Sequence, residues 1–257
     1  MDTARPCATL ALEGDGPVVG RFGGPLMLPA GAPGSIYPFV ASIDLAALPG
    51  DATDLPLPID GHLLLFAFPE ADGGFSTMGE VVYVPAGAAV EERDKNSGAW
   101  FEIEEYREMV EAFPRGQLRA TTHASLPYHY AVEIPEAPYS GPLPGHPRSE
   151  ELARVWQDTP DAIAIRGPLR IGGYASEEAV HHDPVEGVAR CAVRAVEAGG
   201  WGAGGVVSDA VEDWVLLAEW KPGIERREGA IVHWAIQRED LAARRFGRTY
   251  TAVRWNP

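Results

Sequence analysis

Most of the chain is a succession of short apolar runs separated by turn residues. Its 29 glycines and 23 prolines are spread along the sequence, which favours many short elements over long helices. The clearest alternation of apolar and polar positions lies at 128–134. The pattern predicts strands at 8–12, 18–22, 39–43, 62–68, 81–84, 128–134, 214–220, 231–236 and 249–255.

Two segments have helical spacing instead. At 104–113 the large apolar residues recur every three or four positions. The stronger helix starts after Asp183, which can cap it, with Pro184 at the first helical position and Glu186 placed to complete a capping box. Gly199 and Gly200 end it. Short helical turns are expected at 46–48 and 239–246, so the pattern indicates an α+β protein.

Two parts of the chain resemble each other. The run 39–43 is similar to 216–220, and 61–68 is similar to 229–236. Each pair follows a double glycine, Gly23-Gly24 in the first part and Gly172-Gly173 in the second. One interpretation is an internal duplication with units at 20–70 and 170–237, which predicts Phe66 and Trp234 at matching positions. The other is that any two apolar antiparallel strand pairs look alike at this level.

Length and charge narrow the function classes. A chain of 257 residues fits one domain, 1–257. Thirty-seven acidic residues against 21 basic ones give a net charge of −16, which repels nucleic acid and anionic membranes and attracts a basic protein. The acidity also has a simpler explanation, because it keeps a cytosolic protein in solution. Nineteen of the basic residues are arginines, a bias that indicates a GC-rich bacterial genome.

We expect a cytoplasmic location. Cys7 and Cys191 are the only cysteines, too few for a disulfide framework. The N-terminus has no apolar stretch of signal-peptide length. The longest apolar run, 63–68, is far shorter than the roughly 18 residues that a membrane helix needs.

Five motifs in order resemble a known bacterial family. The runs 23–29, 38–45 and 61–66 resemble the opening of the YwqG-like family, 171–174 its central motif, and 214–217 with 231–246 its C-terminal signature. The family-motif residues are Gly23, Gly24, Pro25, Asp44, Gly173, Tyr174, Trp214 and Trp234. Ala175 stands where the family usually has proline, and Glu219 where it usually has glutamine. The chain is therefore similar to a divergent member.

The resemblance carries expectations about fold and function. It implies a coiled, largely antiparallel sheet with peripheral helices. It supplies no catalytic residues, because the family has no assigned activity. Some relatives occur beside genes for secreted toxins, an association that suggests an immunity or binding role.

No residue pattern indicates a particular chemistry. His181, His182 and Asp183 form the densest group of metal-ligand residue types, but Asp183 is explained as a helix cap and a site would need further ligands. His129 and Glu133, four apart on a strand, cannot form a dyad because they lie about 13 Å apart. Nucleophile-elbow, dinucleotide-binding, Walker and EF-hand patterns are absent. We expect no tightly bound metal or organic cofactor.

Two function hypotheses follow. The first is a non-enzymatic module that binds a basic protein, with Trp201, in a glycine-rich loop, as the apolar anchor; the structural alternative is that Trp201 packs on the core. The second is a small-molecule enzyme or sensor that uses a cleft between the two β-units, with His129, His181 or His182 as the titrating group. The sequence does not give the oligomeric state.

Overall fold

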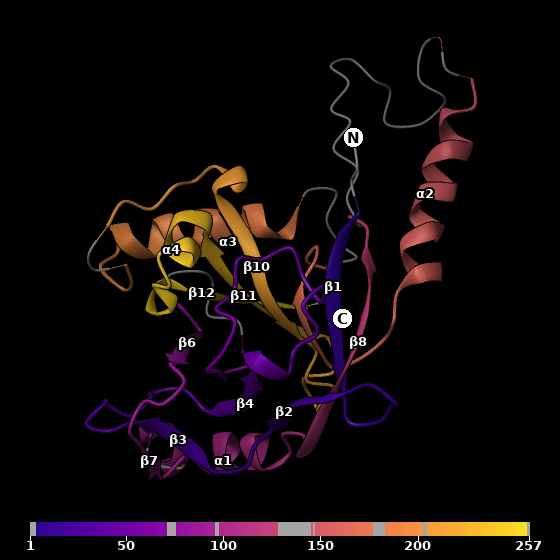
Figure 1. The fold of residues 1–257 in the computed structure, drawn as a ribbon. Coiled ribbons are helices and arrows are strands. Elements are labelled where there is room, and N and C mark those ends of the chain that lie inside the picture. Colours follow the sequence, from indigo (N-terminus) through magenta and orange to yellow (C-terminus); the bar gives the residue numbers. More distant parts are fainter. Residues whose placement is uncertain are drawn as a thin grey trace.

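Within the residues that the structure describes, an antiparallel sheet of ten strands forms the body of the protein (Figure 1). The computed structural model describes residues 4–70, 76–95, 98–127, 145, 147–176, 183–202 and 205–255. In spatial order the strands are β12 (Tyr250–Trp255), β11 (Ala230–Gln237), β10 (Trp214–Trp220), β9 (Leu169–Gly172), β1 (Arg5–Ala11), β8 (Gly116–Ser125), β2 (Val18–Phe22), β4 (Phe39–Asp44), β5 (His62–Ala67) and β6 (Gly79–Val84).

Shorter elements surround this sheet. A two-stranded sheet pairs β3 (Leu26–Pro29) with β7 (Val90–Arg93). The helices are α1 (Glu104–Glu111), α2 (Ser149–Ile163), α3 (Pro184–Glu197) and α4 (Arg238–Ala242). The 3₁₀ turns are η1 (Leu45–Ala47), η2 (Ala99–Glu102), η3 (Val211–Asp213) and η4 (Phe246–Arg248). The predicted fold class, a largely antiparallel α+β protein with peripheral helices, is confirmed.

The sheet curls until its two edge strands meet. The amide of Met78, just before β6, donates to the carbonyl of Thr251 in β12 (2.9 Å), and the amide of Thr251 donates to Oγ1 of Thr77 (3.0 Å). From the inside, Nε1 of Trp234 donates to the carbonyl of Phe66 (3.1 Å). These contacts pair backbone groups that an open sheet edge would leave to solvent.

Strand alternation divides the buried side chains between the two faces. The concave face forms the main core, which includes Leu65, Trp220 and Trp234. On the outer face, α3 covers a second core around Trp214 and Tyr250, and the β3–β7 pair covers a third around Phe66. Within the described residues, no helix is long and apolar enough to cross a bilayer.

The strand register repeats between the two halves of the sheet. Cross-strand partners form the row Phe22, Ala41, Leu65, Val81 in the first half and the row Ile171, Ala218, Trp234, Thr251 in the second. The register shift in β4, between Phe39 and Ala41, has its counterpart in β10, between Leu216 and Ala218. The register therefore matches across β2-β4-β5-β6 and β9-β10-β11-β12, whereas an evolutionary duplication stays a prediction.

The prediction that Phe66 and Trp234 occupy matching positions is wrong by one residue. In the repeated register Trp234 corresponds to Leu65, and Phe66 corresponds to Ala235. A shift of one residue moves a side chain to the opposite face of a strand. Phe66 accordingly packs in the outer core under β3 and β7, while Trp234 lies in the main core.

Some elements differ from the sequence pattern. The strands β3, β7, β8 and β9 and the helix α2 were not predicted. The predicted strand at 128–134 lies outside the described residues. Asp183 caps α3 through the amide of Val185, as expected, but Glu186 pairs with Arg190 (2.9 Å) instead of closing a capping box.

We predict that Trp234→Phe lowers the free energy of unfolding by about 1–3 kcal/mol, because the buried carbonyl of Phe66 loses its indole donor. Urea unfolding followed by circular dichroism measures this. The control is Trp255→Phe, at a half-exposed ring near the chain end, which should change stability by no more than about 0.5 kcal/mol. Equal effects of both variants would contradict a role for the indole in closing the sheet.

Candidate functional site

A row of polar residues crosses the outer face of the second half of the sheet. His233 in β11 pairs with Glu219 in β10, which pairs with Arg170 in β9, which pairs with Thr9 in β1 and then Thr121 in β8. The strand neighbours of His233, Glu219 and Arg170 point into the main core. Alternation therefore turns the polar side chains together onto the outer face. We call these five residues the polar row.

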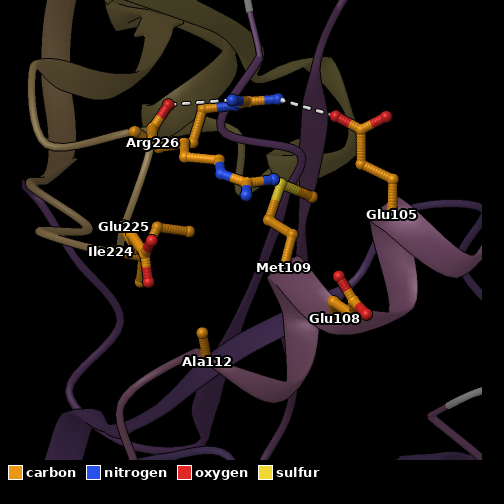
Figure 2. A pocket seen from close by; sticks show the side chains of 8 residues that line it. Glu105, Glu108, Met109, Ala112, Ile224, Glu225 and Arg226 are labelled. Carbon is orange, nitrogen blue, oxygen red and sulfur yellow. Dashed lines mark hydrogen bonds and ion pairs between the residues drawn. The ribbon is translucent and has the colours of Figure 1, made fainter.

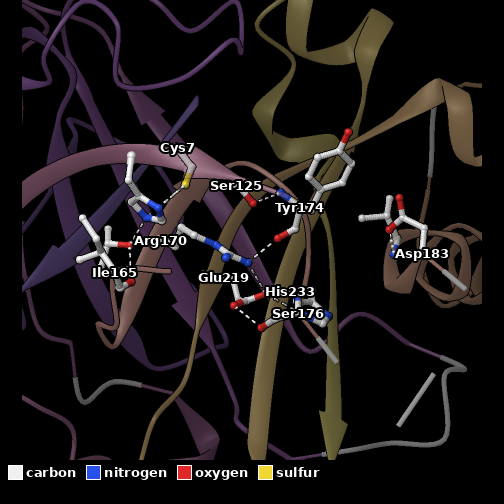
Figure 3. Close-up of polar contacts among 12 residues, drawn as sticks. Cys7, Ser125, Ile165, Arg170, Tyr174, Ser176, Asp183, Glu219 and His233 are labelled. Carbon is white, nitrogen blue, oxygen red and sulfur yellow. Dashed lines mark hydrogen bonds and ion pairs between the residues drawn. The ribbon is translucent and has the colours of Figure 1, made fainter. Parts of the chain in front are cut away.

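Glu219 is the centre of this row, and its carboxylate is fully engaged although it is buried. Oε2 lies 3.0 Å from Nη2 of Arg170 and 3.2 Å from Nε2 of His233. The backbone amide of Ser176 donates to Oε2 (2.7 Å) and its hydroxyl donates to Oε1 (2.7 Å). Figure 3 shows these groups converging on the carboxylate from separate segments.

Opposing effects act on the pKa of Glu219. Burial raises it, but the positive charge of Arg170 and the contact with His233 outweigh burial and hold the pKa well below its usual range. Glu219 is consequently a carboxylate at neutral pH. Its lone pairs are taken up by protein donors, so it is not free to act as a general base.

Arg170 extends the network towards the double glycine. Its guanidinium also donates to the carbonyl of Tyr174, whose amide donates to Oγ of Ser125 (3.1 Å). Gly173 allows this close approach, because a Cβ there would lie 2.9 Å from the Cβ atoms of Cys7 and Ser125. Its φ of +75° is also a conformation that favours glycine.

A cysteine and a histidine meet at the other end of the row. Nε2 of His123 lies 3.3 Å from Sγ of Cys7 and 2.8 Å from Oγ1 of Thr9. Burial raises the pKa of Cys7 to about 11 and lowers the pKa of His123. At neutral pH the pair is therefore a thiol beside a neutral imidazole, not the thiolate that a cysteine nucleophile requires.

His233 makes the fewest hydrogen bonds of the charged residues in the row. Its side chain has no exposed surface, and neither ring nitrogen makes a well-aligned hydrogen bond to a described residue. The 3.2 Å contact with Glu219 becomes an ion pair when the ring is protonated.

A pocket lies close to the chain segment that Arg170 contacts at Tyr174. It has a volume of about 210 Å³ and lies between the start of α3, the start of β10 and Tyr174. Arg5, Asp183 and Arg238 line it, and the guanidinium of Arg5 stacks 4.3 Å from the centre of the Tyr174 ring. None of the five polar-row residues is among its lining.

A family model described as "Domain of unknown function (DUF1963)" matches residues 21–254. The chain belongs to the DUF1963 family. No curated protein matches it. The matched residues include Arg170, Glu219 and His233 of the polar row, whereas β1, which supplies Thr9, precedes them.

Several candidates from the sequence cannot be placed. His129, His181 and His182 lie outside the described residues of this DUF1963 domain. Within the described part, no three histidine, cysteine, aspartate or glutamate side chains gather as metal ligands would. The expectations about these histidines, and about metal and cofactor, therefore stay predictions.

Trp201 is half-buried, and its ring packs edge-on against Tyr250 with 5.1 Å between the ring centres. It belongs to the rim of the core under α3. This contact gives the ring a structural role and leaves part of it exposed. Its role as a binding anchor stays a prediction.

The motif residues shared with the resembled family are mainly architectural. Gly23, Gly24 and Gly173 have positive φ at the ends of β2 and β9, and Pro25 follows the first pair at the surface. Asp44 caps η1 through the amide of Ala46 (3.0 Å). Trp214 donates to the carbonyl of Ser208 (2.8 Å). Together with Trp234 they build turns, caps and core contacts.

Sequence reasoning did not find the polar row. Its one visible signal was Glu219, an acid in an otherwise apolar strand, where the resembled family has glutamine. The partner Arg170 is 49 positions away, and strand pairing alone brings the two together. His233 lies in the otherwise apolar run 231–236, and only the folded structure shows its contact with Glu219.

We predict that Glu219→Gln lowers the free energy of unfolding by about 3–5 kcal/mol at pH 7, because Arg170 loses its buried counter-charge. The folded pKa of Glu219 lies below the unfolded value of about 4.3. Its stabilisation is thus complete above about pH 5 and is lost as pH falls below that. The difference in the free energy of unfolding between wild type and variant should therefore become smaller as the pH falls from 5 to 3. Denaturant unfolding at each pH tests this, with the exposed Glu212→Gln as control; a constant difference would contradict the account.

Proposed function

We propose that this DUF1963 domain is a non-catalytic module that binds a basic protein. The closer likeness to the YwqG-like family, and with it a role in immunity against a toxin, belongs to the same proposal. Its main support is where the carboxylates lie. Glu219, whose pKa is strongly shifted, is enclosed by structural partners, whereas the glutamates on α1 and just before it are exposed.

The helix α1 concentrates these exposed acids. Four of its eight residues are glutamates with exposed side chains, and a fifth exposed glutamate precedes it: Glu102, Glu104, Glu105, Glu108 and Glu111. Added to the net charge of −16, this gives a negative field over one end of the molecule. Such a field raises the association rate of a basic protein by about 10- to 1,000-fold at low salt.

A ligand sensor is the alternative. It would use the pocket of about 210 Å³ beside Tyr174, where Arg5 and Arg238 supply two cations. That volume is below the roughly 300–1,000 Å³ of most small-molecule sites. Asp183 and Glu212 in the same lining would oppose an anionic ligand. These features favour the protein-binding proposal.

The test is capture of partners from a lysate of the source bacterium by the immobilised wild-type protein at 0.1 M and 1 M salt. Captured proteins are identified, purified and measured again by surface plasmon resonance. We expect basic partners whose association rate falls at least about 10-fold at 1 M salt, because the screening length drops from about 10 Å to about 3 Å. A quadruple glutamine variant at Glu104, Glu105, Glu108 and Glu111 should show a similar loss.

Trp201→Ala separates the two roles of that ring. If Trp201 is the binding anchor, the variant should stay folded but no longer bind the purified partner. Packing on Tyr250 predicts lower thermal stability with binding retained. The proposed function would be contradicted if the same proteins were captured at both salt concentrations, by the quadruple variant and by Trp201→Ala.

A further inference from the structure

A pocket lies between α1 and the turn that joins β10 to β11. Its volume is about 190 Å³. One side is formed by α1 with Glu105, Glu108, Met109 and Ala112, and the other by the turn with Ile224, Glu225, Arg226 and Arg227. Figure 2 shows the two sides facing each other, with the Met109 side chain between them. We call this the α1 pocket.

Its lining combines an apolar middle with charged edges. Met109 and Ile224 pack against the main core, so their positions are fixed from beneath. Glu108 and Glu225 are exposed on opposite sides, and among the described residues neither has an ion pair. A long side chain with an apolar stem and a cationic end matches this arrangement, because the stem covers Met109 and Ile224 while the charge reaches the carboxylates.

The chain itself shows how a guanidinium is held here. Arg227 pairs with Glu70 and lies 3.7 Å from Oε1 of Glu105. Its Nη1 also donates to the carbonyl of Arg226 (2.8 Å). One arginine thus already uses the carboxylates at one end of the pocket, while Glu108 and Glu225 stay available.

We propose that the α1 pocket receives an arginine side chain from the basic partner, with its guanidinium between Glu108 and Glu225. This rests on the proposed function and adds the place of contact. Arginine fits better than lysine, because its planar group presents several donors to two carboxylates and is less strongly hydrated over an apolar surface.

Arg226 of this chain opposes the binding of a partner's arginine at the α1 pocket. It lines the pocket and is exposed, so its charge opposes an incoming cation. Its φ of +64° is left-handed, a conformation that asparagine adopts more readily than most residues. Arg226→Asn therefore removes the charge and keeps the turn, and it should tighten binding.

The experiment uses fluorescence anisotropy of a labelled peptide of alternating arginine and glycine at 20 mM salt. Three further peptides replace arginine with lysine, with citrulline (of the same shape but uncharged) or with glutamate. We expect the affinity to be highest for the arginine peptide, lower for the lysine peptide and lowest for the citrulline peptide. The glutamate peptide should not bind. Glu108→Gln/Glu225→Gln should weaken arginine-peptide binding at least about 10-fold, and Arg226→Asn should tighten it about 3-fold.

Matched variants separate the pocket from general charge. Glu13→Gln/Asp15→Asn changes the net charge by the same amount at an exposed turn, and it should weaken binding less than 2-fold. Ala112→Phe fills the pocket without a charge change and should weaken binding as strongly as the glutamine pair. Thermal unfolding confirms that each variant is folded.

Two results would overturn the inference. If both charge-matched double variants weaken binding equally, the α1 pocket is wrong while a general acidic surface, and with it the proposed function, stands. If the wild type binds arginine and citrulline peptides equally or neither, the arginine pocket is wrong. In that case the lysate capture decides the proposed function independently.

Discussion

The ion pair between Glu219 and Arg170 is the interaction on which the second half of the sheet depends. It joins β9 to β10 directly, reaches β11 through His233, and holds the following segment through Ser176 and Tyr174. A buried charge without a partner costs several kcal/mol. The strands therefore have one register in which Glu219 is satisfied, and the double glycine at 172–173 must turn where it does for Ser176 to reach the carboxylate.

The same scaffold position carries different chemistry in the two halves. In the repeated register Arg170, Glu219 and His233 correspond to Arg21, Ser42 and Leu64. Arg21 is exposed and Leu64 packs in the core under β3 and β7. At the third position, one half thus has an apolar side chain and the other a histidine that contacts Glu219. Since the charged groups of this row pair with one another inside the protein, the proposed recognition of a basic partner is assigned to the surface acids.

Much of the fold was predictable because local pattern determines it. The boundaries of β2 and the cap of α3 at Asp183 follow from alternation and capping rules. β8 was missed because the consecutive polar residues 121–123 interrupt its alternation, and α2 because Pro160 inside it signals a helix break. The predicted match of Phe66 with Trp234 was wrong by one residue, because a run of consecutive apolar residues does not reveal which of them faces inward.

The candidate sites show the same limit. Asp44 and the glycines were singled out by the family resemblance, and their roles in the structure, a helix cap and turns, are local. The contacts of Glu219 with Arg170 and Ser176, and of α1 with the turn at 224–227, join residues far apart in sequence, so only the folded chain reveals them. The acidity that predicted a basic partner is visible in composition, but its concentration on α1 depends on which helix residues face solvent.

The central claim is that the polar row is a structural element, and a double-mutant cycle with Arg170→Met and Glu219→Leu tests it most directly. Unfolding free energies of the wild type, both single variants and the double variant are measured at pH 7. The account predicts that each single variant is destabilised by about 3–5 kcal/mol, while the double variant, which leaves neither charge alone, recovers at least about half of that loss and keeps its affinity for the arginine peptide. Additive losses, or a stable double variant that no longer binds the peptide, would contradict it.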